Sequence, residues 1–227
     1  PEVQAEVAEQ IEEYLNSGQP VVIDEESSKR LPISVYAETT PNPKVMKFVA
    51  NKKLVLAPFE FKNIDEAKLS PLASALFHFA FVKEVFLDEN YVSVTKYDVA
   101  EWEDITQELR EFIRLHLQQG NEVIAANVVQ EKKASVTNVP VAEQEDLDET
   151  SKQIIDILEE YVKPAVASDG GNILFKSYDE GSKTVNVILQ GACSGCPSST
   201  FTLKNGIENM LRSMLNDKVQ FVNAVNG

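Results

Sequence analysis

The stretch Gly191-Ala192-Cys193-Ser194-Gly195-Cys196-Pro197 holds both cysteines of this 227-residue chain. Two thiolates three positions apart supply half of a four-ligand metal site or one complete redox dithiol. A zinc or iron–sulfur site built from cysteine alone needs four ligands, so it would require a second copy of the chain. The stretch therefore indicates a functional thiol pair and leaves two chemistries open, metal ligation and thiol–disulfide exchange.

The residues on either side of the cysteines predict a loop that leads into a helix. Gly191 and Gly195 allow backbone conformations that are closed to other residues, and Pro197 fits the first turn of a helix. We expect this helix at residues 198–215. Its expected inward residues are Leu203, Ile207, Met210, Leu211 and Met214. Both sulfurs then lie near a helix N-terminus, where the helix dipole favours thiolate, the form that binds metal and attacks disulfides.

A small domain with the order α-β-β-α-β is predicted around this loop, over residues 150–227. Besides the helix after the cysteines, its expected elements are a helix at 151–162 that ends at Lys163-Pro164, a tight turn at 168–172, strands at 173–178 and 184–190, and a strand at 219–225. The first two strands form a hairpin, and the last one closes the sheet.

A second domain, of α/β type, is predicted over residues 31–120. Its expected strands are 33–37, 45–50, 54–56, 85–87 and 91–96, and its expected helices are 70–80 and 102–118. The fold class is therefore α/β (α+β), with two small domains. Residues 121–149 contain an acidic run and no aromatic residue, which indicates a flexible linker between them. Residues 1–30 form an acidic leader, with a short amphipathic helix expected at 3–15.

The formal net charge of −15 argues against nucleic acid as a partner, because phosphate backbones require basic surfaces. The charge is uneven: residues 1–30 carry 8 acids and 2 bases, and residues 118–150 carry 7 acids and 2 bases. No apolar run is long enough to span a membrane, so no membrane association is expected. Two cysteines this close together suit a reducing compartment.

Three alternatives follow from the cysteines. A zinc site within one chain would need histidines, but His78 and His116 lie in the other domain on helix faces rich in Phe and Leu, where we expect ordinary helix residues. A CxxC dithiol–disulfide oxidoreductase is usually found beside a βαβ unit, whereas here a hairpin precedes the loop and no long parallel unit is expected. An interaction module could also join two chains around zinc. The residues alone leave these alternatives open.

At this point the sequence resembles a known family. Residues 151–227 are similar to the Nfu domain, the C-terminal domain of NifU-type iron–sulfur scaffold proteins. The shared stretches are Val162-Lys163-Pro164, Ser168-Asp169-Gly170-Gly171-Asn172, the cysteine loop and Thr202-Leu203-Lys204-Asn205-Gly206-Ile207-Glu208. Two positions depart from the family pattern, with Asn172 in place of the usual Asp and Lys163 in place of the usual Arg. Neither change touches the sulfur ligands.

The upstream domain resembles the Nfu N-terminal domain. The shared stretches are Thr40-Pro41-Asn42-Pro43-Lys44, Lys47-Phe48, Ser70-Pro71-Leu72-Ala73, Leu76-Phe77, Val92-Ser93-Val94-Thr95-Lys96 and Trp102. Together the two resemblances cover residues 33–118 and 150–227, and they leave the leader and the linker unexplained.

The resemblance implies that Cys193 and Cys196 of two protomers hold one [4Fe-4S] cluster between them. The two cysteines would then be both the metal ligands and the cofactor-binding residues. It implies a non-enzymatic scaffold or carrier with no catalytic residues, a homodimer when loaded. Its partners would be apo iron–sulfur client proteins and an upstream assembly machinery, with the N-terminal domain recognising partners. The acidic leader favours the bacterial cytoplasm. The alternative is the mitochondrial matrix after removal of a transit peptide, because the chain does not begin with Met.

Overall fold

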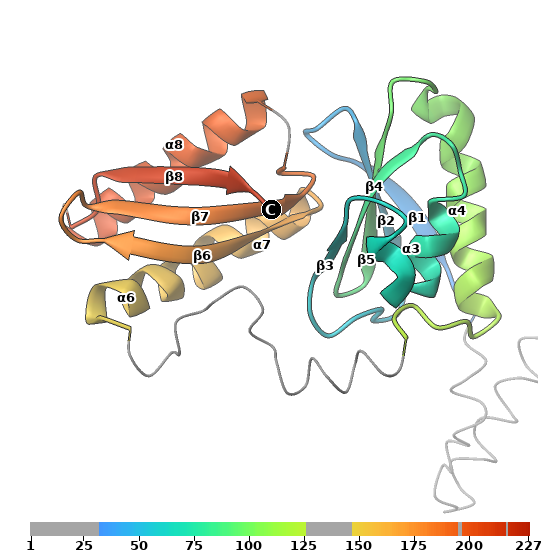
Figure 1. The fold of residues 1–227 in the computed structure, drawn as a ribbon, viewed down its shortest axis with the longest axis horizontal. Helices are drawn as coiled ribbons and strands as arrows, with labels where there is room; N and C mark the ends of the chain where they lie inside the picture. The colour runs from blue at the N-terminus through green and yellow to red at the C-terminus, as the bar shows by residue number, and fades with distance from the viewer. Residues whose placement is uncertain (1–31, 126–146, 195–196, 217) are drawn as a thin grey trace, which may run out of the picture. The chain divides into compact units, whose positions relative to one another are not determined.

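The computed structural model describes residues 32–125, 147–194, 197–216 and 218–227, and Ile33–Gly227 forms one compact unit. Within these residues the chain folds into two α+β domains (Figure 1). The expected helix at 3–15, the leader and most of the predicted linker lie outside the described residues, so these expectations and the exact domain boundaries stay predictions.

The N-terminal domain is built on a five-stranded sheet with the order β1-β2-β5-β4-β3, in which every neighbouring pair is antiparallel. The strands are β1 (Val35–Thr39), β2 (Val45–Ala50), β3 (Phe59–Phe61), β4 (Val82–Asp88) and β5 (Tyr91–Lys96). The expected strand at 54–56 is wrong. The third strand comes five residues later, because Phe59 and Phe61 alternate with Glu60 and pair with β4.

Two helices and a short 3-10 turn cover one face of this sheet. They are η1 (Glu66–Leu69), α3 (Pro71–Leu76) and α4 (Trp102–Gln118). The core between helices and sheet contains Phe48, Val85, Leu87, Val92 and Val94 from the strands and Leu72, Leu76, Leu109 and Ile113 from the helices. Helix α3 ends four residues before the predicted boundary, whereas α4 has the bounds that the sequence predicts.

The opposite face of the same sheet is also buried at its centre. All six residues of β2 are buried, although strand side chains alternate between the two faces. The side chains of Val49, Phe86 and Tyr91 form a separate small cluster on this second face. An antiparallel sheet commonly leaves one face to water, so the second face must be covered by another part of the structure.

The C-terminal domain has the predicted order α-β-β-α-β. Its elements are α6 (Glu149–Ile157), the π-helical turn η2 (Leu158–Val162), α7 (Lys163–Ser168), β6 (Gly171–Asp179), β7 (Thr184–Gly191), α8 (Pro197–Met214) and β8 (Phe221–Asn226). Buried residues of α6, η2 and α8 pack with alternate residues of β7, which places Val185, Val187 and Leu189 in the core. Among the described residues, none of the helices combines the length and the apolar content needed to cross a bilayer.

Two local expectations in this domain are wrong. Pro164 does not end the first helix: the chain passes through η2 and continues as α7, with Pro164 in the first turn of α7, where a missing N–H costs nothing. In addition, β7 and β8 are parallel, so the cysteine loop joins the strand and helix of a β7-α8-β8 crossover. The expected absence of a βαβ unit therefore no longer argues against a dithiol oxidoreductase.

Helix α8 is held by fewer inward residues than the sequence predicts. Ile207 and Leu211 are buried and Leu203 and Met210 partly buried, but Met214 is 44% exposed. The helix that follows the cysteines is therefore fixed mainly by Ile207 and Leu211.

We expect Leu211→Ala to lower the free energy of unfolding by about 2–5 kcal/mol, because it opens a cavity beneath α8. Met214→Ala on the same helix is the matched control and should cost less than about 1 kcal/mol, since much of that side chain is in water. Urea denaturation of the full-length protein measures both. Similar losses in the two variants would contradict this packing.

Candidate functional site

Cys193 lies in the loop between the end of β7 and the start of α8. Its side chain is only 7% exposed and packs with the core of the C-terminal domain. The N–H of Ser194 donates to the carbonyl oxygen of Gly191 at 3.0 Å, which closes a tight turn around the cysteine. Cys196 falls outside the described residues, and its predicted role as a ligand stays a prediction, as does that of Cys193.

The turn between α7 and β6 packs directly against Cys193. A Cβ atom on Gly171 would lie 2.8 Å from the sulfur of Cys193 and 2.6 Å from the carbonyl oxygen of Gln190, so only hydrogen fits there. The N–H of Ala192 donates to the carbonyl oxygen of Gly170 at 3.1 Å. The glycine pair and the cysteine loop, which the sequence shows as two separate motifs, thus form one structure.

Two glycines of this structure adopt left-handed backbone conformations. Gly170 has a φ of +80° and Gly191 a φ of +62°. A Cβ atom on Gly191 would also lie 2.8 Å from both the carbonyl oxygen of Gly170 and the ring of Phe86. Glycine is therefore required at position 191 for its backbone conformation and for the close approach of its neighbours.

Helix α8 begins at Pro197, directly after the cysteine pair, as the sequence predicts to within one residue. The helix dipole places partial positive charge at this end. A thiolate in the loop is favoured there, which suits both chemistries that the sequence leaves open.

The histidines have other partners in the N-terminal domain. The ring of His78 lies 2.9 Å from the carbonyl oxygen of Ser74, and that of His116 lies 3.1 Å from the carbonyl oxygen of Glu122. In the part of the chain that the structure describes, no three His, Cys, Asp or Glu side chains gather in a way that could hold a metal ion. The described residues thus contribute Cys193 as the candidate ligand.

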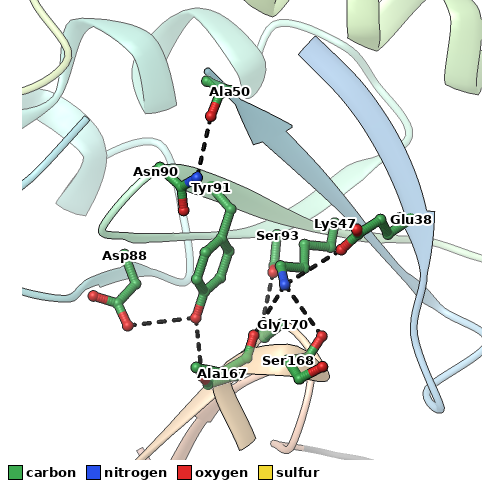
Figure 2. A network of polar contacts seen from close by, with 11 residues as sticks. Glu38, Lys47, Ala50, Asp88, Asn90, Tyr91, Ser93, Ala167, Ser168 and Gly170 are labelled. Carbon is green, nitrogen blue, oxygen red and sulfur yellow. Dashed lines mark hydrogen bonds and ion pairs between the residues drawn. The ribbon is translucent and has the colours of Figure 1, made fainter. Parts of the chain in front are cut away.

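Three side chains from the second face of the N-terminal sheet hold the glycine turn (Figure 2). The hydroxyl of Ser93 donates to the carbonyl oxygen of Gly170 at 2.7 Å, and that of Tyr91 donates to the carbonyl oxygen of Gly171 at 3.0 Å. The ammonium group of Lys47 donates to the carbonyl oxygens of Ala167 and Ser168, both at 3.1 Å. Lys47 therefore satisfies carbonyls in the last turn of α7, where a cation is favoured.

Two further residues of the N-terminal domain reach the cysteine loop itself. Asn42 donates from its Nδ2 to the carbonyl oxygen of Ala192 at 3.1 Å, and its Oδ1 accepts from the N–H of Lys44, which orients the amide. The N–H of Gly191 donates to Oε1 of Glu60 at 2.8 Å. The loop thus has contacts with both domains.

Burial raises two pKa values at this interface. Burial raises the pKa of the Glu60 carboxyl above its usual range, although the N–H of Gly191 opposes this shift. Burial, together with the nearby charge of Asp88, also raises the pKa of the Tyr91 phenol. Tyr91 therefore stays protonated. Its hydroxyl oxygen lies 3.0 Å from the carbonyl oxygen of Gly171 and 3.4 Å from Oδ2 of Asp88, so its single hydrogen favours the shorter bond to Gly171.

Asn172, where the resemblance noted in the sequence implies Asp, is buried at the start of β6. Its Nδ2 donates to Oε1 of Gln190 at 3.0 Å, whereas its Oδ1 has no hydrogen-bond partner among the described residues. The amide thus replaces a charge at a position where a carboxylate would be desolvated.

Sequence reasoning identified Cys193 but missed the residues that surround it. Asn42, Lys47 and Ser93 belong to stretches that carry the family resemblance. The sequence therefore indicated that they matter, but not that they lie against the cysteine loop and its neighbouring turn. Tyr91 and Glu60 carried no signal. Their role follows only from the pairing that places them on the second face and at the edge of the sheet.

Two family models match the chain. The model described as scaffold protein Nfu/NifU N terminal matches residues 35–120, and the model described as NifU-like domain matches residues 154–222. The chain belongs to the Nfu/NifU family. The second match contains the cysteine loop, the glycine turn and α8, so the site lies within the NifU-like domain.

Curated relatives match most of this chain. A Drosophila willistoni protein named NFU1 iron-sulfur cluster scaffold homolog, mitochondrial, is 34% identical over 78% of this chain and 59% of its own length. The Arabidopsis thaliana NifU-like protein 4, mitochondrial, is 33% identical over 81% of this chain and 63% of its own length. The chain thus spans less than two thirds of each of these relatives.

Solved structures are more distant. The solution structure of a NifU-like protein from Saccharomyces cerevisiae is 24% identical, with a TM-score of 0.37, over 41% of this chain and 86% of that one. A likeness of this size adds nothing to the assignment of the site.

We expect Gly191→Ala to lower the free energy of unfolding by at least about 2 kcal/mol, through left-handed strain and the contact with Gly170. Gly206→Ala is the matched control, because nothing lies within 4 Å of the added Cβ, and it should stabilise α8 by about 0.5–1 kcal/mol. Thermal and urea denaturation measure both. A neutral Gly191→Ala would show that the loop does not need this conformation.

We expect Glu60→Gln to be more stable than the native protein at neutral pH, with a difference that shrinks on acidification. Because the pKa of Glu60 is raised in the folded state, the folded protein loses stability as the pH rises above 4.5, the usual pKa of the carboxyl. The amide of Gln avoids this loss and still offers an acceptor to the N–H of Gly191. Urea denaturation from pH 4 upward measures the difference. A lower stability of Glu60→Gln across this range would contradict the direction.

Proposed function

We propose that this chain is a non-enzymatic iron–sulfur carrier, in which Cys193 and Cys196 of two protomers hold one [4Fe-4S] cluster that is then passed to apo-proteins. The observation that carries the proposal is the position of the only cysteine pair in the sequence, in a NifU-like domain between β7 and the N-terminus of α8. The names of the mitochondrial relatives as iron–sulfur cluster scaffolds support it.

The number of ligands supports the dimer. A [4Fe-4S] cluster is held by four thiolates, and the chain has two cysteines. The two histidines contact backbone carbonyls in the other domain, and in the described residues no three His, Cys, Asp or Glu side chains gather in a way that could hold a metal ion. The two cysteines of a second protomer would complete the four thiolate ligands.

A cluster held between two chains suits a carrier. Each chain contributes only two ligands, so a client thiolate can replace them stepwise by ligand exchange. The cluster is then cargo, and the apo-proteins that accept it and the machinery that supplies it are the partners of the carrier. The relatives named as mitochondrial support the mitochondrial matrix as the location, the alternative to the bacterial cytoplasm that the leader favoured.

A dithiol–disulfide oxidoreductase is the second candidate. The observation in its favour is the β7-α8-β8 crossover, which places the CxxC at the start of a helix after a parallel strand. Such an enzyme would cycle between a dithiol and an intramolecular disulfide within one chain, without iron and without a second protomer. The two functions therefore differ in iron content and in oligomeric state.

We expect Cys193→Ala and Cys196→Ala each to abolish cluster binding and the dimer that forms on loading, because each removes two of the four ligands from the pair of chains. Anaerobic reconstitution with iron and sulfide, followed by absorbance, iron analysis and gel filtration, measures both effects. The native protein should give a brown dimer with about four irons per two chains.

The matched controls are His78→Ala and His116→Ala, which should load iron like the native protein. Retention of the cluster in either cysteine variant would contradict ligation by two residues from each chain. An iron-free protein with a reversible intramolecular disulfide would instead favour the oxidoreductase.

A further inference from the structure

The second face of the N-terminal sheet is covered by another part of the same chain. Its central side chains are Lys47, Val49, Phe86, Tyr91 and Ser93, and all of them are buried. The groups that cover this face belong to the same chain, in the turn that follows α7 and in the loop that follows β7. The sheet face therefore already has a partner, and this partner is the cysteine loop with its supporting turn.

The contacts are polar as well as apolar. Tyr91 and Ser93 donate to the backbone carbonyls of the glycine pair, and Asn42 donates to a carbonyl of the loop. Lys47 donates to two carbonyls in the last turn of α7. In the opposite direction, the N–H of Gly191 donates to the carboxylate of Glu60. In these hydrogen bonds the C-terminal domain contributes backbone carbonyls and one backbone N–H. The sheet therefore recognises the backbone shape of the loop rather than its side chains.

One of these hydrogen bonds and one packing contact depend on glycine. A Cβ atom on Gly170 would lie 2.8 Å from the hydroxyl oxygen of Ser93, and one on Gly191 would lie 2.8 Å from the ring of Phe86. The residues that shape the loop for Cys193 therefore also let the sheet approach it. Loop shape and docking share the same glycines.

We propose that the second face of the N-terminal sheet closes over the cysteine loop of its own chain, and that this docked state must open before a second protomer can share a cluster. The proposal rests on the proposed function. The N-terminal domain then acts as an intramolecular competitor for the site, in addition to any role in recognising partners.

Docking and cluster sharing compete for the same loop. Cys193 is only 7% exposed and packs with the core of the C-terminal domain, while Asn42 and Glu60 bind the backbone of Ala192 and Gly191 beside it. To share a cluster, a partner chain must bring its two thiolates close enough to Cys193 for one cluster to bind both chains. The loop that it must approach is already in contact with the sheet. The docked state therefore holds an unloaded loop, and its opening sets how fast a second protomer gains access.

Amide exchange of the full-length apo-protein, followed by NMR, reads the docked state directly. The N–H of Gly191 is bonded across the interface to Glu60, whereas the N–H of Val222 is bonded to the carboxylate of Glu208 inside the C-terminal domain at 3.1 Å. The first amide reports opening of the interface. The second is a control of the same chemistry away from it.

We expect Tyr91→Phe to speed the exchange of Gly191 about fivefold, and the double variant with Ser93→Ala roughly twentyfold, because each change removes one hydrogen bond from the docked state. Val222 should exchange as in the native protein. Tyr178→Phe is the matched control variant, since it removes a hydroxyl that donates to the carbonyl of Lys218 within the C-terminal domain. Lys47→Met is an independent second variant and should act in the same direction as Tyr91→Phe.

Unchanged exchange of Gly191 in all interface variants, or equal acceleration of Gly191 and Val222, would overturn the docked state. Iron and sulfide loading then tests its effect: the double variant should load faster than the native protein, and Tyr178→Phe should not. Faster exchange without faster loading would overturn the competition. If no version of the protein binds iron, the proposed function fails, while the exchange of Gly191 still decides whether the sheet docks.

Discussion

The contact between Gly171 and the sulfur of Cys193 constrains the rest of the site. A Cβ atom at position 171 would meet that sulfur at 2.8 Å, so the strand that starts at Gly171 and the loop that holds the cysteine can coexist only with glycine there. This contact sets where β6 begins relative to the end of β7. Gly171 pairs with Gly191 at the end of β7, and Cys193 lies in the loop between this pair and the start of α8 at Pro197.

The same turn explains why the N-terminal sheet is buried on both faces. One face carries the apolar core beneath α3 and α4, as expected for an antiparallel sheet packed against helices. The other face offers Lys47, Tyr91 and Ser93 to backbone carbonyls of the turn. Backbone carbonyls at the end of a short helix need donors, and the neighbouring sheet supplies them.

Periodic segments were predictable and isolated contacts were not. The apolar face of 102–118 gave α4 its bounds, and the hairpin and the helix after the cysteines were found to within a few residues. The strand expected at 54–56 was wrong, since a three-residue strand is defined by its pairing with β4 rather than by its own pattern. The helix through Pro164 was missed because proline is acceptable in a first turn, which sequence alone cannot distinguish from a helix end.

The sequence by itself determined the number and spacing of the thiols: two cysteines in one loop, too few for a complete sulfur-ligated site within one chain, in a motif order that indicates a NifU-like domain. Only the tertiary structure decided what surrounds the loop. Ligand number is a property of composition, so it can be counted along the chain. The approach of Asn42, Glu60 and Tyr91 to residues more than seventy positions away depends on strand pairing and on close packing of backbone at glycine, which no local pattern encodes.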